Sequence, residues 1–263
     1  MTNFYTLLRT ELAEAWKDYK FIWLTLFFVI LGVTQPLINA YMDIILEHAG
    51  GAEGIILDPN RPIPSSAEVL LSTVSGQFNQ IGLIILIISL MGLIATDRNS
   101  GVQDFILTRP VSLKSYLLSK LASHWLISMF SISIGALVSY YYTIFLFGAF
   151  SFSSYLLFLI LYGIWILYVI SLTIVISTFV KSPILIAVTT ISIAILLILI
   201  KGFTHPLTQL LPSGILTLAE NHLLTSQDLN YFSILTCLFF IFFNVFLANL
   251  NMKSFSLWKS DTI

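Results

Sequence analysis

Charged residues and cysteine are scarce in this sequence, and each scarcity excludes a class of protein. Charged residues make up 10% of the 263 positions, whereas soluble domains usually carry about a quarter. The single cysteine, Cys237, excludes an internal disulfide framework. A net charge of −1 provides no basic field for nucleic acid. We therefore expect neither a soluble domain nor a nucleic-acid-binding protein.

Catalytic motifs are also missing. The sequence has no glycine-rich phosphate loop ending in Lys-Ser or Lys-Thr, so we predict that the chain does not hydrolyse ATP itself. No glycine-flanked serine marks a nucleophile elbow. The histidines show neither metal-ligand spacing nor an HExxH motif, and we interpret them as interfacial polar residues: His48, His124, His205 and His222. We expect no catalytic residue, metal site or cofactor on this chain.

Long apolar runs dominate what remains, since 57% of the residues are hydrophobic. Runs of about 18 or more apolar residues are typical of membrane-spanning helices. The sequence predicts six, over residues 21–41, 78–95, 121–147, 154–180, 183–200 and 231–250. The third and fourth are longer than a bilayer requires. The fold class is therefore an all-α membrane protein with six transmembrane helices, forming a single domain over residues 1–263.

No Asp, Glu, Lys or Arg lies deep within these six runs. Carriers driven by an ion gradient usually need such groups as relays or ion ligands. If the protein moves a solute, the energy is expected to come from a partner.

Lysine and arginine predict the orientation in the membrane. With the N-terminus inside, ten of the 12 basic residues fall on inside segments, and only Arg61 and Lys201 fall outside. Because inside loops carry the excess of Lys and Arg, we predict a multi-pass protein of the cell membrane with both termini in the cytoplasm.

The first twenty residues precede the first span and have their own helical pattern. Leu8, Leu12 and Trp16 fall on one apolar face, and charged residues fall opposite. This pattern predicts an elbow helix over residues 1–20 that lies on the membrane lipid. The alternative is the frayed start of the first span.

Two segments on the outer side differ in character. Residues 42–77 are rich in glycine and proline, which predicts an extracellular loop of turns. Residues 202–229 are too apolar for a free loop, but Pro206, Pro212 and Gly214 interrupt any long helix. We predict two short re-entrant helices there, buried in protein or lining a cavity.

Residues 97–120 form the most charged inside loop. A short helix is expected over residues 102–108, followed by a break at Arg109-Pro110. Ser112 is expected to cap the next helix, which continues through Lys120 into the third span. Such a bracket is suited to dock a soluble partner through its charges. The alternative is an ordinary positively charged inside loop.

This segment resembles the ABC-2 type permease subunits of ATP-binding-cassette transporters. The resemblance rests on an acidic residue, Ser-Gly, a short apolar helix, Arg-Pro-Val-Ser and a later lysine. The matching positions are Asp97, Ser100, Gly101, Phe105, Ile106, Leu107, Arg109, Pro110, Val111, Ser112, Tyr116 and Lys120. The family often has glutamate where this chain has Asp97.

The resemblance implies that this bracket is a coupling helix seated on a separate ATPase subunit, which would hold ATP and Mg. The implied ATPase-coupling residues are Asp97, Arg98, Ser100, Gly101, Asp104, Phe105, Leu107, Arg109, Pro110 and Lys114. The elbow helix would brace that contact. A second permease chain, identical or paralogous, would complete the path. Since the family mostly exports, the resemblance implies outward movement of an amphiphile such as a peptide, a lipid-like molecule or a drug.

Two other functions remain open from sequence. A membrane scaffold, sensor or immunity subunit of the same fold would bind an ATPase without moving cargo. An intramembrane enzyme would act alone on a lipid or peptide, although the sequence contains no evident catalytic pair for one.

Overall fold

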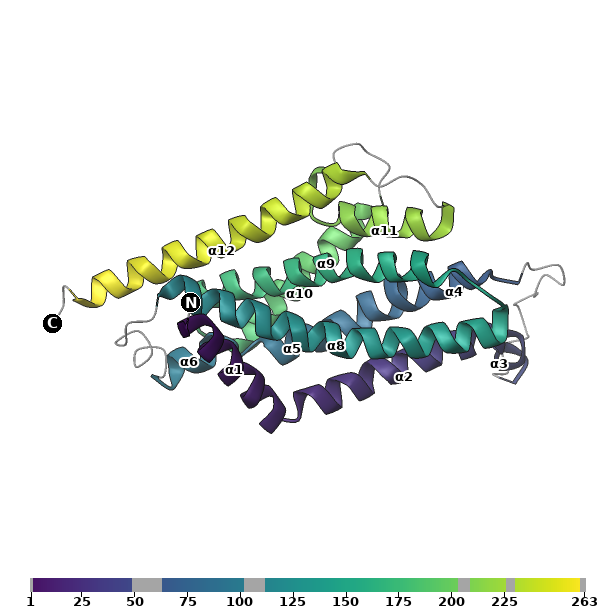
Figure 1. Ribbon diagram of the computed structural model, residues 1–263, viewed down its shortest axis with the longest axis horizontal. Coiled ribbons are helices and arrows are strands. Elements are labelled where there is room, and N and C mark those ends of the chain that lie inside the picture. The colour runs from purple at the N-terminus through teal and green to yellow at the C-terminus, as the bar shows by residue number, and fades with distance from the viewer. Residues whose placement is uncertain (1, 49–62, 102–111, 203–208, 226–229, 261–263) are drawn as a thin grey trace.

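The computed structural model describes residues 2–48, 63–101, 112–202, 209–225 and 230–260, and every regular element within these ranges is a helix. The helices form an elongated bundle, and both chain ends lie toward the same end of it (Figure 1). The predicted residues 102–108 of the bracket lie outside the described ranges.

Six helices in the described part of the chain are long and apolar enough to cross a membrane, which confirms the predicted number. They are α2 (Lys20–Ala40), the composite Ser66–Asn99, α8 (Leu113–Phe147), α9 (Phe152–Phe179), α10 (Pro183–Lys201) and Tyr231–Lys253 within α12 (Tyr231–Ser260). With its 35 residues, α8 extends about 52 Å at 1.5 Å per residue. It therefore projects beyond a hydrocarbon core of about 30 Å, as its predicted length implied.

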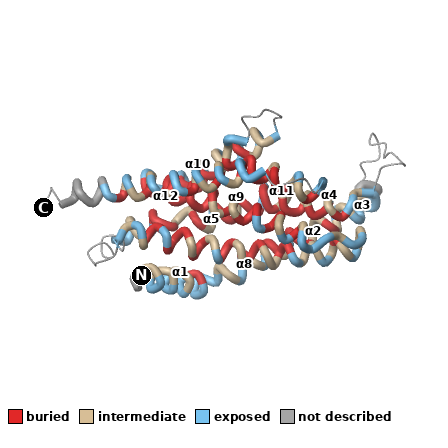
Figure 2. The backbone as a smooth tube through the Cα atoms, turned by 45° about the horizontal axis from the view of Figure 1, so that its top comes forward, coloured by how far each residue is buried: buried red, intermediate tan, exposed pale blue. Residues whose placement is uncertain are grey.

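The helix α9 forms the centre of the bundle. In its most apolar stretch 83% of the residues are buried, against 28% for α2, α10 and the span in α12. Figure 2 shows the same contrast between the buried α9 and the exposed outer faces of its neighbours. Its largest buried side chains include Tyr155, Phe158 and Trp165. The outer helices are left with apolar faces suited to lipid.

The pair α2 and α8 packs through two glycines. A Cβ atom on Gly32 would lie 2.2 Å from the carbonyl oxygen of Gly135, and one on Gly135 would lie 2.5 Å from the carbonyl oxygen of Phe28. Neither distance is possible for real atoms, so both positions require glycine. Small residues of this kind allow the backbones of membrane helices to approach closely.

The N-terminal helix α1 (Thr2–Lys17) is separate from the first span. Tyr19 adopts a left-handed conformation with φ 57°, and α2 begins at the next residue. A non-glycine residue in this region marks a sharp change of chain direction. Consequently α1 is a distinct helix that packs against α8, and the alternative of a frayed first turn of α2 is wrong.

The second span begins earlier than predicted, because residues 66–77 are helical and are not part of a loop. Its parts are α4 (Ser66–Leu71), the π-helix η1 (Ser72–Gly82), α5 (Leu83–Leu90) and α6 (Ala95–Asn99), and α3 (Met42–His48) precedes it. Ser65 and Glu68 form a capping box that starts α4. The polar residues that obscured this span bond to neighbouring helices: Asn39 Nδ2 donates to Ser72 Oγ at 3.1 Å.

The segment before the last span contains α11 (Gly214–Thr225). Its apolar residues Ile215, Leu216 and Leu218 are buried, which confirms that they do not belong to a free loop. An ion pair between Lys201 and Glu220 holds α11 against the end of α10. Of the two re-entrant helices predicted here, one α-helix lies in the described part, and residues 203–208 lie outside it.

Candidate functional site: a buried ion cluster at the junction of three helices

The cluster begins with the end of the second span. Here α6 ends at Asn99, and Gly101 follows with φ 75°. Within the described part of the chain, no atom outside its chain neighbours lies within 4 Å of a Cβ placed on Gly101, so glycine is favoured there for its backbone conformation. This left-handed glycine after the last helical residue is a common way to end a helix.

The start of α8 supplies the opposite side. Ser112 Oγ accepts a hydrogen bond from the Ser115 amide at 3.1 Å, which confirms the predicted cap. From this start, Tyr116, Lys120 and His124 follow one another at intervals of four residues. Side chains at this spacing lie on one face of a helix, and this face of α8 meets α1 and α6.

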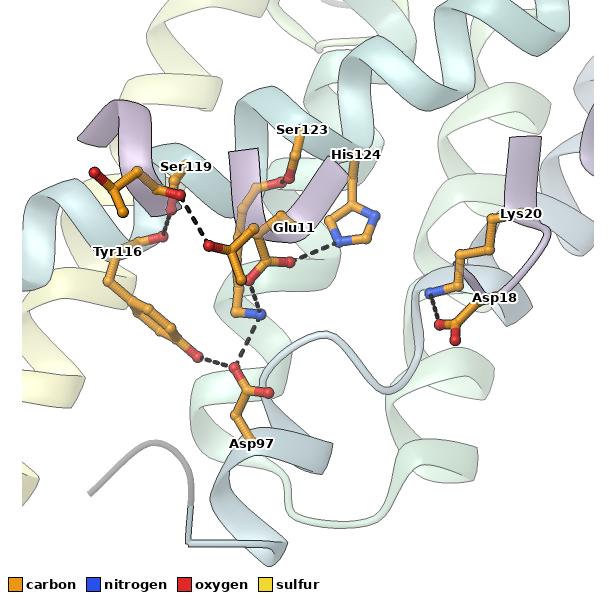
Figure 3. Close-up of polar contacts among 11 residues, drawn as sticks. Glu11, Asp18, Lys20, Asp97, Tyr116, Ser119, Ser123 and His124 are labelled. Carbon is orange, nitrogen blue, oxygen red and sulfur yellow. Dashed lines mark hydrogen bonds and ion pairs between the residues drawn. The ribbon is translucent and has the colours of Figure 1, made fainter. Parts of the chain in front are cut away.

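Lys120 lies at the centre of the cluster. Its Nζ is 2.7 Å from Glu11 Oε1 on α1 and 2.9 Å from Asp97 Oδ2 on α6 (Figure 3). Tyr116 donates its hydroxyl hydrogen to Asp97 Oδ2 at 2.6 Å. His124 Nε2 lies 3.5 Å from Glu11 Oε2. One lysine thus joins α1, the end of the second span and the start of the third.

Burial makes these contacts energetically important. The Lys120 side chain is 4% exposed, against 15% for Glu11 and 21% for Asp97. Burial alone would raise the pKa of the Glu11 carboxyl, but His124 and Lys120 together lower that pKa from 4.5 to about 2. Glu11 is therefore ionised at neutral pH, and the lysine charge is compensated in place.

A small cavity of about 200 Å³ adjoins the cluster. It is lined by residues of α1, the second span and α8, and by Lys20. The pKa of Glu14 is raised by burial and by the nearby Glu11 carboxylate. On this side, the ion pairs of Glu11 add to the apolar contacts of Leu7, Leu12 and Ala15 that hold α1 to the bundle.

The predicted coupling residues fall into three groups. Asp97 joins the cluster, whereas Arg98 turns toward α9, where it donates to two backbone carbonyls. Three residues are exposed: Ser100, Gly101 and Lys114. Five lie outside the described residues: Asp104, Phe105, Leu107, Arg109 and Pro110.

Among the predicted elbow residues, Leu8 and Leu12 are partly buried, and Leu12 packs against the core. Trp16 is 66% exposed, and its ring lies 5.9 Å from that of Phe21. The first two face the protein, and Trp16 faces outward, as a side chain in contact with lipid would.

Sequence reasoning missed Glu11 and His124. Glu11 lies four residues after Leu7 and four before Ala15, both on the inward face of α1. A carboxylate within an apolar stripe was the available signal, since a buried carboxylate usually requires a cationic partner. His124 was interpreted as an interfacial residue, but it is buried against α1.

The fold and this site define a multi-pass helical membrane protein. No group of three His, Cys, Asp or Glu side chains suited to a metal occurs among the described residues. Residues 5–238 match the family described as ABC-2 family transporter protein. A relative, the uncharacterized transmembrane protein YxlG of Bacillus subtilis (strain 168), is 38% identical over 177 residues, covering 67% of each chain. The chain belongs to the ABC-2 transporter family, whose members are membrane permease subunits.

Proposed function

We propose that this chain is the permease subunit of an exporter for amphiphilic molecules, driven by a separate ATP-binding-cassette ATPase that binds the segment between α6 and α8. The observation that carries the proposal is the ion cluster around Lys120. It joins α1, α6 and α8 at the two ends of that segment. A partner that pushes on the segment would move all three helices together.

In this mechanism, ATP and Mg bind the partner, and the permease supplies the moving helices. Nucleotide binding displaces the segment, and the cluster transmits that displacement to the elbow helix and the third span. Ion pairs of this geometry give a stiff connection, because each partner loses a buried charge contact if it moves alone. The helices then move as rigid bodies between two states.

A second permease chain completes the path in this proposal. Gln80 is exposed on η1, near the middle of the second span, and Gly76 one turn earlier faces open space. An amide facing hydrocarbon without a partner is costly, so this polar surface favours another chain or a water-filled path. Beside it, Thr34 donates to Gln77 Oε1 at 3.2 Å, which continues the polar surface onto α2.

Orientation and direction belong to the same proposal. The excess of lysine and arginine on one side supports a cytoplasmic position for both termini, the ion cluster and the ATPase. Outward movement then carries the cargo away from the nucleotide side. The apolar outer faces of the bundle favour a cargo that enters from the bilayer.

Co-purification with candidate ATP-binding-cassette ATPases tests the proposal. We expect a stable complex whose ATP hydrolysis is altered by Arg109→Ala and not by Lys17→Met, an exposed lysine on α1. Vesicles containing the complex are then assayed with a fluorescent phospholipid and an amphiphilic cationic dye. Vanadate-sensitive outward movement of either probe supports export. Association without movement of either probe supports a scaffold or sensor, and no association contradicts the proposal.

A further inference from the structure

The end of α9 receives a side chain from the second span. Arg98 Nη2 donates to the Ser177 carbonyl at 3.0 Å and to the Thr178 carbonyl at 2.9 Å. Both acceptors lie in the last turn of α9, where carbonyl groups have no partner within the helix. Arg98 therefore caps α9 across a separation of 79 and 80 residues in the sequence.

The last span binds the same point. Asn251 on α12 donates its Nδ2 hydrogens to the Thr178 carbonyl at 2.9 Å and to Thr178 Oγ1 at 3.2 Å. One turn at the end of α9 thus accepts hydrogen bonds from α6 and from α12. We call this set of residues, Arg98, Ser177, Thr178 and Asn251, the α9 clip.

Electrostatics explains why an arginine is suited to this position. Among the described residues, no carboxylate forms an ion pair with Arg98, and its charge faces the carbonyls at the negative end of the α9 dipole. The planar guanidinium also presents donors in a fixed direction. Ser177 and Thr178 are buried, whereas Arg98 itself is partly exposed.

We infer that Arg98 is a positioning residue. It transmits movement of the segment between α6 and α8 to the fourth span, α9, and to the sixth span in α12. This inference rests on the proposed function. Asp97 and Arg98 are consecutive on α6, yet they bind different helices: Asp97 binds α8, and Arg98 binds α9. The segment between α6 and α8 begins just beyond them. In this inference, displacement of the segment reaches the third span and α1 through Asp97. It reaches the central helix α9 through Arg98.

If Arg98 only stabilised the end of α9, its replacement would not change how the end of α9 responds to nucleotide. The test therefore measures that response with and without the Arg98 side chain. In a Cys237→Ser background, the reporters S182C and S100C occupy exposed positions beyond α9 and α6. Fluorescein maleimide labelling rates are measured on the complex with its ATPase, without nucleotide and with ATP plus vanadate. The readout is the ratio of the two rates. At both reporters we expect the labelling rates without nucleotide and with ATP plus vanadate to differ by about fivefold or more, as in ordinary allosteric coupling.

Arg98→Gln is expected to abolish the nucleotide response of S182C and to leave that of S100C. Arg98→Lys, which keeps the charge but not the planar donor group, is expected to retain part of the S182C response. Lys181→Gln removes an exposed charge beside the reporter and serves as the matched control. Its local effect on thiol reactivity cancels in the ratio.

An unchanged S182C response in Arg98→Gln, or no S182C response in the otherwise unmodified complex, overturns the inference while the proposed function stands. If Arg98→Gln does not assemble, Arg98→Lys decides, and a full response there contradicts the role. Failure of any ATPase to associate overturns the proposed function and the inference with it.

Discussion

Replacing Lys120 by methionine tests the ion cluster most directly. Methionine keeps most of the side-chain length but removes the ammonium group that lies 2.7 Å from Glu11 and 2.9 Å from Asp97. At these distances each pair attracts by about 6 kcal/mol at an effective dielectric constant near 20. Most of that attraction only offsets the desolvation of the charges. The intact cluster therefore contributes little to the net free energy of unfolding. Removing only one of its charges, in contrast, lowers that free energy.

The size of the loss follows from what remains after the change. Two carboxylates would stay buried without their cation, and truncating one partner of a buried pair costs about 3–5 kcal/mol. Because Glu11 and Asp97 keep 15% and 21% exposure, we expect the lower end, about 3 kcal/mol. In a domain of this size, that loss lowers the unfolding midpoint by about 6–12 °C.

Thermal unfolding of the purified protein in detergent measures this effect. Lys17→Met, which removes an exposed lysine of α1, is expected to change stability by less than about 0.5 kcal/mol. The triple variant E11Q/D97N/K120M removes every charge of the ion cluster and should return to within about 1 kcal/mol of the native protein. If Lys120→Met is as stable as Lys17→Met, or if the triple variant is the least stable, the reasoning about buried charge is refuted.

Three further predictions follow from the same structure. The pKa of Glu11 is lowered in the folded protein, so the contribution of its carboxylate to stability is full above pH 4.5 and is lost as the pH falls toward about 2. The difference in melting temperature between the native protein and Glu11→Gln should therefore narrow as the pH falls through this window. Gly32→Ala should cost about 1–3 kcal/mol by forcing α2 from α8, whereas Gly76→Ala, with open space around it, should not destabilise, as paired denaturation curves would show. Trp165→Phe removes the donor 3.0 Å from Asn79 Oδ1 and should cost about 1–3 kcal/mol in the same assay.

Much of the architecture was predictable because it depends on local composition. The six spans, the short connection between α9 and α10, and the Ser112 cap each depend on a stretch of sequence considered by itself. The start of the second span was not predictable in this way. Residues such as Ser72 and Gln77 lower the local hydropathy, and their compatibility with a buried helix depends on partners in α2.

The candidate site was predictable only in part. The resemblance included Asp97, Tyr116 and Lys120 among its matching positions. It also implied an ATPase-coupling role for Arg98, whose guanidinium binds α9, and that role stays a prediction. Glu11 escaped detection because no nearby residue indicates its partner. The contacts of the residues 102–111 with an ATPase stay a prediction.

The sequence by itself determined that the chain is helical, that it crosses the membrane six times, and that it lacks a recognisable ATP-binding motif. Hydropathy over about twenty residues and motif spacing are sufficient for those conclusions. Only the tertiary structure decided which charges meet. Lys120 and Glu11 are 109 positions apart, and their contact exists because α1 folds back from the left-handed Tyr19 onto α8. Buried charges need partners, and the packing of helices selects those partners.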